Sequence, residues 1–261
     1  MRRNASNGVV FYRFDGLDGV EGLRHTVLTR IGGVSHGPYA TLNLGHTVGD
    51  EPAAVEENHR RALALLGLEP GQVVSPWQVH GASVGIVGRE HIGAICPETD
   101  ALLTTTPGVP LMMRFGDCTP VLLCDPVQRV AGMAHAGWRG IVAGVIEASV
   151  QTMTEELGSD VKDIWAGIGP TIGPCCYEVG ADVAQEVSDA CPSEAEVIRR
   201  VNGRVHADLP GAAEAQLRAE GVERIEQAGL CTSCRVDEFF SHRAEDGETG
   251  RFGIVIGWTD G

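Results

Sequence analysis

The segment from Leu111 to Gly140 is the most informative about the fold and reads LMMRFGDCTPVLLC over residues 111–124 and VAGMAHAGWRG over residues 130–140. It contains three apolar runs with the length of buried strands, at Leu111–Phe115, Val121–Cys124 and Val130–Ala134. A turn with Asp117 and Cys118 separates the first two runs, and the third ends directly at His135. Strand-end turns on a rigid scaffold are where reactive side chains are commonly presented, so we expect a functional site here.

On either side of this segment, short apolar runs predict further strands at Val9–Phe14, His25–Thr29, Val73–Val79, Ala82–Val87, Ile164–Ile168 and Gly253–Trp258. Helices are predicted from Pro52 to about Leu66, and over Ile141–Leu157, Ala181–Ala190 and Pro210–Glu220. Residues 1–8 are expected to be a frayed tail, and 30–49 an ordered Gly-rich loop. Because strands and helices mix without βαβ alternation, linker or repeat, we expect one α+β domain of layered sheets and helices over residues 1–261.

Composition narrows the class of protein. The chain has 20 Lys and Arg against 35 Asp and Glu, a formal net charge of −15, which argues against a nucleic-acid or anionic-membrane surface. It shows no secretion signal and no window approaching about 18 apolar residues, so we expect a cytoplasmic protein without a membrane span. In that setting its eight cysteines are interpreted as thiols rather than a disulfide framework.

Three residues at strand ends have metal-ligand chemistry: His80, Cys118 and His135. Two imidazoles and one thiolate suit zinc, and three protein ligands leave an open position, which is the catalytic pattern. The same donors accept copper, so ligand type does not choose the metal. The separations of 38 and 17 residues match no local zinc motif. From spacing alone the favoured interpretation is structural, with each histidine a hydrogen-bonded turn residue and Cys118 a small buried hydrophobe.

A competing metal set is Cys231 and Cys234 with His242. One CxxC is half of a zinc site, and no second pair lies at a suitable spacing. Cys175 and Cys176 are adjacent, and adjacent thiols rarely chelate one ion. Packing or surface exposure is therefore the favoured interpretation of these four cysteines.

Arginines in Gly-rich turns are candidates for binding an anion. Arg30 and Arg139 lie in such turns, and Arg243 follows the run FFSH at 239–242. A guanidinium held by a rigid turn suits bidentate binding of phosphate or carboxylate. The alternative is a surface arginine that contacts a carbonyl.

Several blocks together resemble a known family. They are TRIGGVS at 29–35, PYATLNL at 38–44, VEEN at 55–58, QVHG at 78–81, TDA at 99–101, DCTP at 117–120, HAGWRG at 135–140, GIGP at 167–170, IGP at 172–174, YEVG at 177–180, CT at 231–232, FFSHR at 239–243 and TGR at 249–251. The chain resembles the laccase-domain family, also called the multicopper polyphenol oxidase family and now the purine nucleoside phosphorylase family, over roughly Thr26 to Trp258.

The resemblance implies a layered α/β/β/α sandwich similar to the catalytic domain of cytotoxic necrotizing factor. It implies zinc at His80, Cys118 and His135, with copper as the alternative metal. It implies phosphorolysis of adenosine, inosine and methylthioadenosine, and deamination of adenosine. An older interpretation of the family is copper-dependent oxidation of phenols, and another assigns bacterial members to the removal of misincorporated residues from peptidoglycan precursors. In the block FFSHR at 239–243, the family usually has Tyr before the Arg, whereas this chain has His242, which bears on substrate preference.

The expected partners are therefore a purine nucleoside and phosphate. A zinc-bound water would attack purine C6 in deamination. In phosphorolysis, Arg30 and Arg139 would hold phosphate, with Asn43 and Arg243 as further candidate ligands. Asp117 or Asp100 would serve as the acid, although either could cap a turn.

Three other functions remain open. Copper oxidation of phenols with O₂ needs many histidine ligands, whereas the chain has nine His and no His-x-His pair. A cysteine hydrolase would use Cys118 as nucleophile and a histidine as base. A binding or assembly module without catalysis is the remaining alternative.

Overall fold

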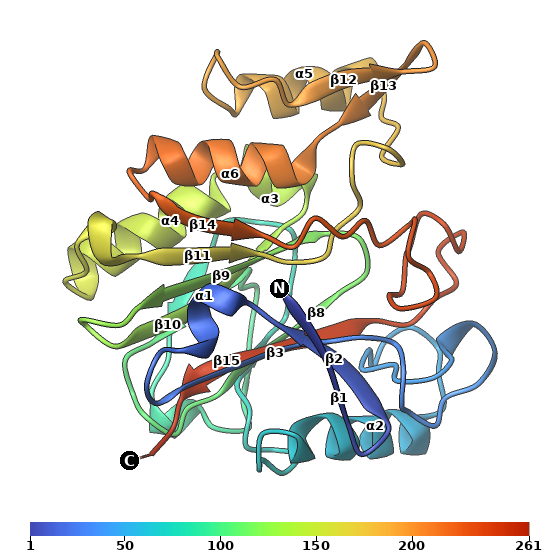
Figure 1. Cartoon of the computed structure of the whole chain (residues 1–261), viewed down its shortest axis with the longest axis vertical. Coiled ribbons are helices and arrows are strands. Elements are labelled where there is room, and N and C mark those ends of the chain that lie inside the picture. Colours follow the sequence, from blue (N-terminus) through green and yellow to red (C-terminus); the bar gives the residue numbers. More distant parts are fainter. Residues whose placement is uncertain (261) are drawn as a thin grey trace.

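Two stacked sheets form the middle of the molecule in the computed structural model, which describes residues 1–260 (Figure 1). The first sheet has the order β1-β2-β3-β15-β8, and every neighbouring pair in it is antiparallel. Its strands are β1 Arg2–Ser6, β2 Val9–Arg13, β3 Leu23–Leu28, β15 Phe252–Trp258 and β8 Leu111–Phe115. We call it the five-stranded sheet.

The second sheet has the order β14-β11-β9-β10-β7-β5, with parallel pairs at both edges and antiparallel pairs between. Its strands are β14 Arg224–Gln227, β11 Trp165–Ile168, β9 Thr119–Asp125, β10 Val130–Ala136, β7 Ala101–Thr104 and β5 Val84–Ile86. We call it the six-stranded sheet. Two small sheets pair β4 Ser75–Pro76 with β6 Ile95–Cys96, and β12 Ile198–Val201 with β13 Arg204–Ala207.

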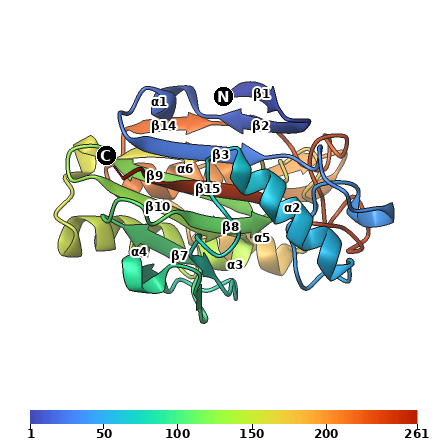
Figure 2. The same ribbon diagram turned by 90° about the horizontal axis from the view of Figure 1, so that it is seen from below.

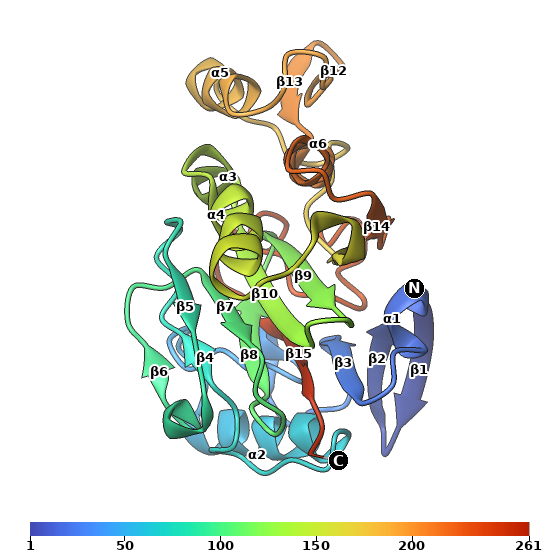
Figure 3. The ribbon, with the colours of Figure 1, turned by 90° about the vertical axis from the view of Figure 1, so that its left-hand side faces the viewer.

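Helices cover both outer faces of this pair of sheets. In Figures 2 and 3, α2 Pro52–Ala64 lies across the five-stranded sheet, whereas α3 Trp138–Val142, α4 Val145–Gln151 and α6 Leu209–Ala219 lie on the six-stranded sheet. The hairpin β12–β13 and α5 Ala181–Asp189 lie beyond α6 (Figure 1). The remaining helical segments are α1 Asp15–Asp18, η1 Gly37–Tyr39, η2 Arg89–His91, η3 Thr152–Glu156 and η4 Val161–Asp163.

Alternation along the strands creates three apolar cores. In β9, Leu122 faces the space between the sheets, whereas Leu123 faces the helices α4 and α6. In β15, Ile254 faces the space between the sheets, whereas Val255 faces α2. Successive side chains of a strand point to opposite faces, so strands with both faces covered are apolar at every position. The resulting layer order is helix, sheet, sheet, helix.

The predicted mixed class with stacked sheets and helices is thus confirmed, and so are most of the predicted strands. The specific likeness to cytotoxic necrotizing factor stays a prediction. Within residues 1–260, no helix is long and apolar enough to cross a membrane.

The expectation of a frayed tail over residues 1–8 is wrong. Residues Arg2–Ser6 form β1, which pairs with β2 at the sheet edge. The amino group of Met1 lies 2.7 Å from a carboxylate oxygen of Glu226 and anchors the end of the chain. Side chains of β1 are mostly exposed, so the segment has no apolar alternation to predict a strand.

The expectation of one helix over Ile141–Leu157 is also wrong. The chain breaks between α3 and α4 at Gly144, whose φ of 81° lies in the left-handed region. The last turns, Thr152–Glu156, are a π-helix. The apolar pattern of the sequence does not reveal this break, because α3 and α4 pack their apolar faces on the same core and the helical spacing continues across Gly144.

The predicted strand Val73–Val79 is reduced to two residues, Ser75–Pro76, and Ala82–Val87 to three, Val84–Ile86. The runs flanking Cys118 are strands as expected, but β8 lies in the five-stranded sheet and β9 in the six-stranded sheet. The turn at 116–118 therefore carries the chain from one layer to the next, which places Cys118 between the sheets.

Folding buries a histidine in its neutral form. His25 is only 3% exposed, and its Nε2 accepts a hydrogen bond of 2.8 Å from the Phe14 amide. Burial, with the Arg13 charge, lowers the pKa of His25 to about 4. The unfolded chain titrates near 6.5, so it binds more protons than the folded chain between these values. The contribution of neutral His25 to the stability of the folded chain is complete above about pH 6.5 and is lost as pH falls toward 4.

We therefore expect His25→Gln to show a weaker loss of unfolding free energy than the wild type between pH 6.5 and 4. The slopes of unfolding free energy against pH should differ by at most about 1.4 kcal/mol per pH unit, which corresponds to the uptake of one proton on unfolding. Urea unfolding at a series of pH values measures it, with exposed His36→Gln as control. Equal slopes for His25→Gln and the wild type would contradict this assignment.

Candidate metal centre

Three elements that are far apart in the sequence bring His80, Cys118 and His135 together. His80 follows β4, Cys118 ends the crossing turn, and His135 lies in β10. One ligand atom from each residue, the Cys118 Sγ and a ring nitrogen of each histidine, lies within 4.8 Å of the others. The two imidazoles meet edge to face with ring centroids 4.8 Å apart. The sequence-predicted triad is therefore one spatial cluster.

Local backbone geometry accounts for this convergence. Pairing of β10 with β9 sets His135 opposite Pro120, two residues after Cys118. The residues His80 and Asp117 both have positive φ, 64° and 88°, which turns the chain sharply at the two loops. Gly137 must lack a side chain, because a Cβ there would lie 2.9 Å from Cys118 Sγ.

The buried carboxylate of Asp100 connects two of the three ligands. One of its oxygens, Oδ1, lies 2.9 Å from His135 Nδ1 and accepts the His80 amide at 2.9 Å. The other oxygen accepts the amides of Val79 and Gly81 at 3.1 and 2.8 Å. Asp100 is fully buried. This bond to Nδ1 leaves Nε2 of His135 for a metal, which is the usual arrangement around ligating histidines.

The charges in this cluster favour a thiolate. Burial raises the pKa of Cys118, but His135 and His80 outweigh it and lower the value to about 6. Burial lowers the pKa of His135, but the charge of Cys118 and the bond to Asp100 raise it to about 9. The pKa of Asp100 is lowered because its hydrogen bonds, led by His135, outweigh burial. A thiolate is the form of cysteine that binds metals and attacks electrophiles.

The triad opens into a cavity of about 670 Å³. Two arginines line it, Arg114 from β8 and Arg251 from the segment before β15. Arg251 donates to the carbonyls of Thr249 and Gly250, whereas the Arg114 guanidinium forms no hydrogen bond or ion pair within residues 1–260. Burial lowers the pKa of both, yet an arginine stays cationic. Other lining residues are His46, Thr47, Trp77, Gln78, Ile95 and His242.

Two predicted anion ligands instead hold loops together. Arg30 donates to the carbonyls of Ala40 and Val236, pairs with Glu245 at 2.9 Å and stacks on Phe240. It does not line the cavity. Asn43 is fully buried and joins the backbone at Gly45 and Arg251. Asn43 therefore positions the arginine that does line the cavity.

The carboxylate of Asp117 is also engaged in structural bonds. Its two oxygens accept from Thr232 Oγ1 at 2.6 Å and from the Arg243 amide at 2.7 Å. Asp117 is not among the residues that line the cavity, although its neighbours Gly116 and Cys118 are. This placement favours a positioning role for Asp117 over the predicted role of an acid.

Arg139 and Arg243 lie outside the cavity lining as well. The Arg139 guanidinium stacks on Trp138 at 4.3 Å, and that of Arg243 stacks on Tyr177 at 5.0 Å. Arg243 also donates to the carbonyl of Glu178. Burial and the Cys118 charge raise the pKa of Tyr177 to about 12, although the charges of Arg243 and Arg139 act to lower it.

The residue that sequence reasoning missed is Arg114. It lies within Leu111–Phe115, an apolar run that the pattern identifies only as a buried strand. A single charge inside a buried strand requires a cavity or a partner, and this signal was available in the sequence. Arg251 appeared only as part of a family block, without a role.

Asp100→Asn removes the carboxylate charge while keeping the side-chain shape. We expect 10- to 100-fold weaker Zn²⁺ binding, on the order of the known effect of partners of ligating histidines. Competition against a chromophoric chelator measures the affinity. The control is Asp125→Asn, another buried aspartate, at the far end of β9. Wild-type affinity in Asp100→Asn would show that this carboxylate does not orient the metal ligand.

Comparison with known proteins places this site in context. The family model described as multi-copper polyphenol oxidoreductase laccase matches residues 24–259. A protein named purine nucleoside phosphorylase from Streptomyces griseus is 42% identical over 243 residues, covering 92% of this chain and 96% of that one. One of the same name from Deinococcus radiodurans is 42% identical over 236 residues, covering 89% and 88%.

Solved structures agree with the sequence matches. The crystal structure of YlmD from Geobacillus stearothermophilus superimposes with a TM-score of 0.92 at 34% identity, covering 98% of both chains. That of YfiH from Bacillus licheniformis has a TM-score of 0.90 at 29% identity, covering 97% of both. With the family model covering most of its length, the chain belongs to the multi-copper polyphenol oxidoreductase laccase family.

Proposed function

We propose that this protein is a zinc-dependent purine nucleoside phosphorylase acting on adenosine, inosine and methylthioadenosine, and that the same site deaminates adenosine. The observation that carries the proposal is the convergence of His80, Cys118 and His135 with two arginines in one cavity. The names of two relatives support the reaction class, since the proteins from Streptomyces griseus and Deinococcus radiodurans are called purine nucleoside phosphorylases.

The three donors fit a catalytic zinc ion. Two imidazole nitrogens and a thiolate are ligands that zinc prefers, and their mutual separation allows one ion to contact all three. His135 has its second nitrogen engaged by Asp100, as ligating histidines commonly do. A zinc ion with three protein ligands supplies Lewis acidity and lowers the pKa of water at its open position.

The cavity offers what the two substrates need. Its volume of about 670 Å³ is within the range of small-molecule sites. Trp77 is 55% exposed in the cavity lining and offers an indole face for a purine. The guanidinium of Arg114, which has no partner within residues 1–260, would hold phosphate together with that of Arg251 through charge-assisted hydrogen bonds.

Phosphorolysis then follows from positioning. A phosphate oxygen attacks the anomeric carbon of the ribose while the bond from that carbon to the purine N9 breaks. The electron pair of this bond leaves with the purine, which takes up the proton that hydrogen phosphate loses, and ribose 1-phosphate remains. The arginines neutralise phosphate, whose charge would otherwise oppose its entry into a protein of net charge −15.

Arg114→Gln tests the anion site. Because a charged hydrogen bond contributes about 1.5–3 kcal/mol, we expect kcat/KM for phosphate to fall roughly 10- to 100-fold. Adenine formation from adenosine at a series of phosphate concentrations measures it. Arg61→Gln on α2, where the arginine pairs with Glu57, is the matched control and should behave as wild type.

Product analysis tests the reaction itself. Wild-type protein should release adenine from adenosine only when phosphate is present, and inosine without it, whereas Cys118→Ala should do neither. Full activity in Cys118→Ala, or no product from a zinc-loaded wild type, would contradict the proposal. The metal that wild type contains and Cys118→Ala lacks decides between zinc and copper at the triad.

A second candidate, a cysteine hydrolase, is favoured by one specific observation. Cys118, His135 and Asp100 form a chain of a low-pKa thiol, an imidazole and a buried carboxylate. This is the arrangement of nucleophile, base and orienting group found in covalent catalysis. The two functions make opposite demands on Cys118, because a thiolate bound to zinc does not serve as the free nucleophile.

Alkylation separates these two candidates. In the phosphorylase, zinc should protect Cys118 from iodoacetamide, and removal of zinc by a chelator should allow its modification. Peptide mass mapping with and without zinc identifies the modified residue, with Cys191, a free cysteine outside both metal-capable clusters, followed in parallel. Rapid alkylation of Cys118 in the zinc-loaded protein would favour the hydrolase.

A further inference from the structure

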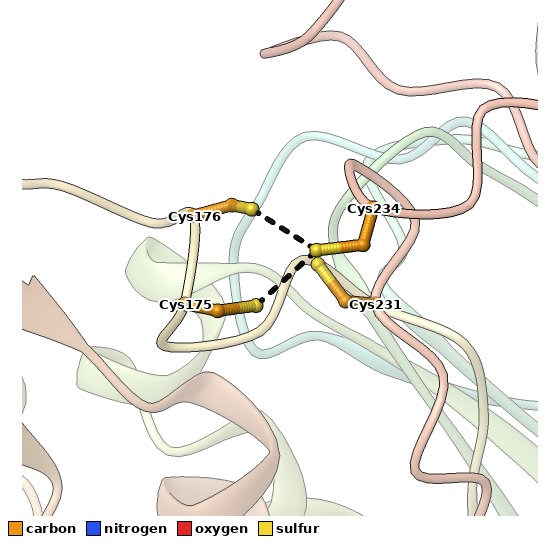
Figure 4. A group of neighbouring side chains, drawn as sticks. All are labelled: Cys175, Cys176, Cys231 and Cys234. Atoms are coloured by element: carbon orange, nitrogen blue, oxygen red, sulfur yellow. Dashed lines mark hydrogen bonds between the residues drawn. The ribbon is translucent and has the colours of Figure 1, made fainter.

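Four of the eight cysteines form a second cluster, separate from the triad: Cys175, Cys176, Cys231 and Cys234 (Figure 4). Cys175 and Cys176 lie in the loop after β11, and Cys231 and Cys234 lie in the segment after β14. The four sulfur atoms lie within 4.8 Å of one another. In Figure 4 the side chains of both loops point toward a common centre.

The spacing of the sulfur atoms fits one bound ion. Cys234 Sγ lies 3.6 Å from that of Cys175 and 3.4 Å from that of Cys176. Four thiolates about 2.3 Å from a tetrahedral zinc ion lie about 3.8 Å apart. A disulfide needs about 2.05 Å. From this geometry we propose that the cluster is a structural tetrathiolate zinc site, which is independent of the proposed catalytic function.

The four sulfur donors determine which ion this site would bind and what it could do. Four thiolates complete the tetrahedron and leave no position for a substrate, which is the pattern of a structural site. Soft sulfur donors select zinc over hard cations such as magnesium or calcium. The Gly173 amide donates to Cys231 Sγ at 3.3 Å, which supports a sulfur that carries negative charge. Cys175 and Cys234 are exposed, so an ion has a path of entry.

The folded chain explains how adjacent cysteines share one ion. A tight turn in which the Cys176 amide bonds to the Gly173 carbonyl at 3.0 Å brings both sulfurs to the same side. A Cβ at Gly173 would lie 3.4 Å from the Cys175 sulfur and 3.4 Å from Cys231 Cβ, so a larger residue would crowd the cluster. The expectation that Cys175 and Cys176 are packing or surface thiols does not account for this convergence.

A zinc ion here would fix two loops that both contact the residue beside Cys118. Thr171, in the first loop, donates to the Asp117 carbonyl at 2.8 Å. Thr232, between the two cysteines of the second loop, donates to the Asp117 carboxylate at 2.6 Å. The two loops also pair directly, since the Thr232 amide bonds to the Thr171 carbonyl. The cysteine cluster therefore positions the turn that presents Cys118.

Metal counting tests the proposal. Protein purified under reducing conditions from zinc-supplemented cells should contain two zinc ions per chain, one for each cluster. The double variant Cys231→Ser/Cys234→Ser should retain one, and Cys118→Ser should retain the other. The control Cys191→Ser should retain both, because Cys191 belongs to neither cluster. The proposal would be overturned if Cys118→Ser contained no zinc, or if wild type contained a single zinc ion and Cys118→Ser lost it.

Two measurements on protein with the cluster intact remain decisive if the double variant does not fold. Cobalt(II) bound to Cys118→Ser should give the intense visible and near-ultraviolet absorption of a tetrahedral tetrathiolate site. Thiol titration after unfolding in chelator without reductant should find all eight cysteines in wild type. Absence of the cobalt spectrum, or six or fewer titratable thiols from a disulfide in this cluster, would overturn the proposal, as would iron in place of zinc.

Discussion

The candidate site depends on the buried carboxylate of Asp100. It accepts three consecutive backbone amides from the loop of His80 and also the ring of His135, so one group fixes two ligands of different elements. A buried charge without such partners would be strongly destabilising. The carboxylate therefore requires the loop to close around it, and the closed loop sets His80 beside His135.

The third ligand depends on the layering of the sheets. The chain leaves the five-stranded sheet at β8 and enters the six-stranded sheet at β9, and Cys118 lies at this crossing. Arg114 belongs to the first sheet and His135 to the second, so the cavity between them joins a candidate anion ligand to the candidate metal ligands. The proposed cysteine site acts on the same crossing through Asp117. Metal binding and anion binding would thus follow from one stacking arrangement.

Much of this could be predicted from the sequence. Apolar runs predict the central strands because that signal is local. The ends of these strands make His80, Cys118 and His135 candidates, and the family resemblance predicts them as metal ligands. Edge strand β1 could not be found this way, since its exposed side chains carry no apolar period. The contacts that Arg30 and Asn43 make with other loops could not be predicted, because hydrogen bonds to distant carbonyls and amides leave no pattern in the sequence. The four-cysteine cluster depends on two loops that meet only in the fold.

The claim that His80, Cys118 and His135 hold one metal ion is tested most directly by anomalous X-ray diffraction. Data would be collected from crystals of zinc-supplemented protein on both sides of the zinc absorption edge. We expect a zinc peak within coordination distance of Cys118 Sγ and of one ring nitrogen of each histidine, with His135 Nδ1 still bonded to Asp100. Crystals without a zinc peak among these three residues, from protein with demonstrated phosphorolytic activity, would contradict it.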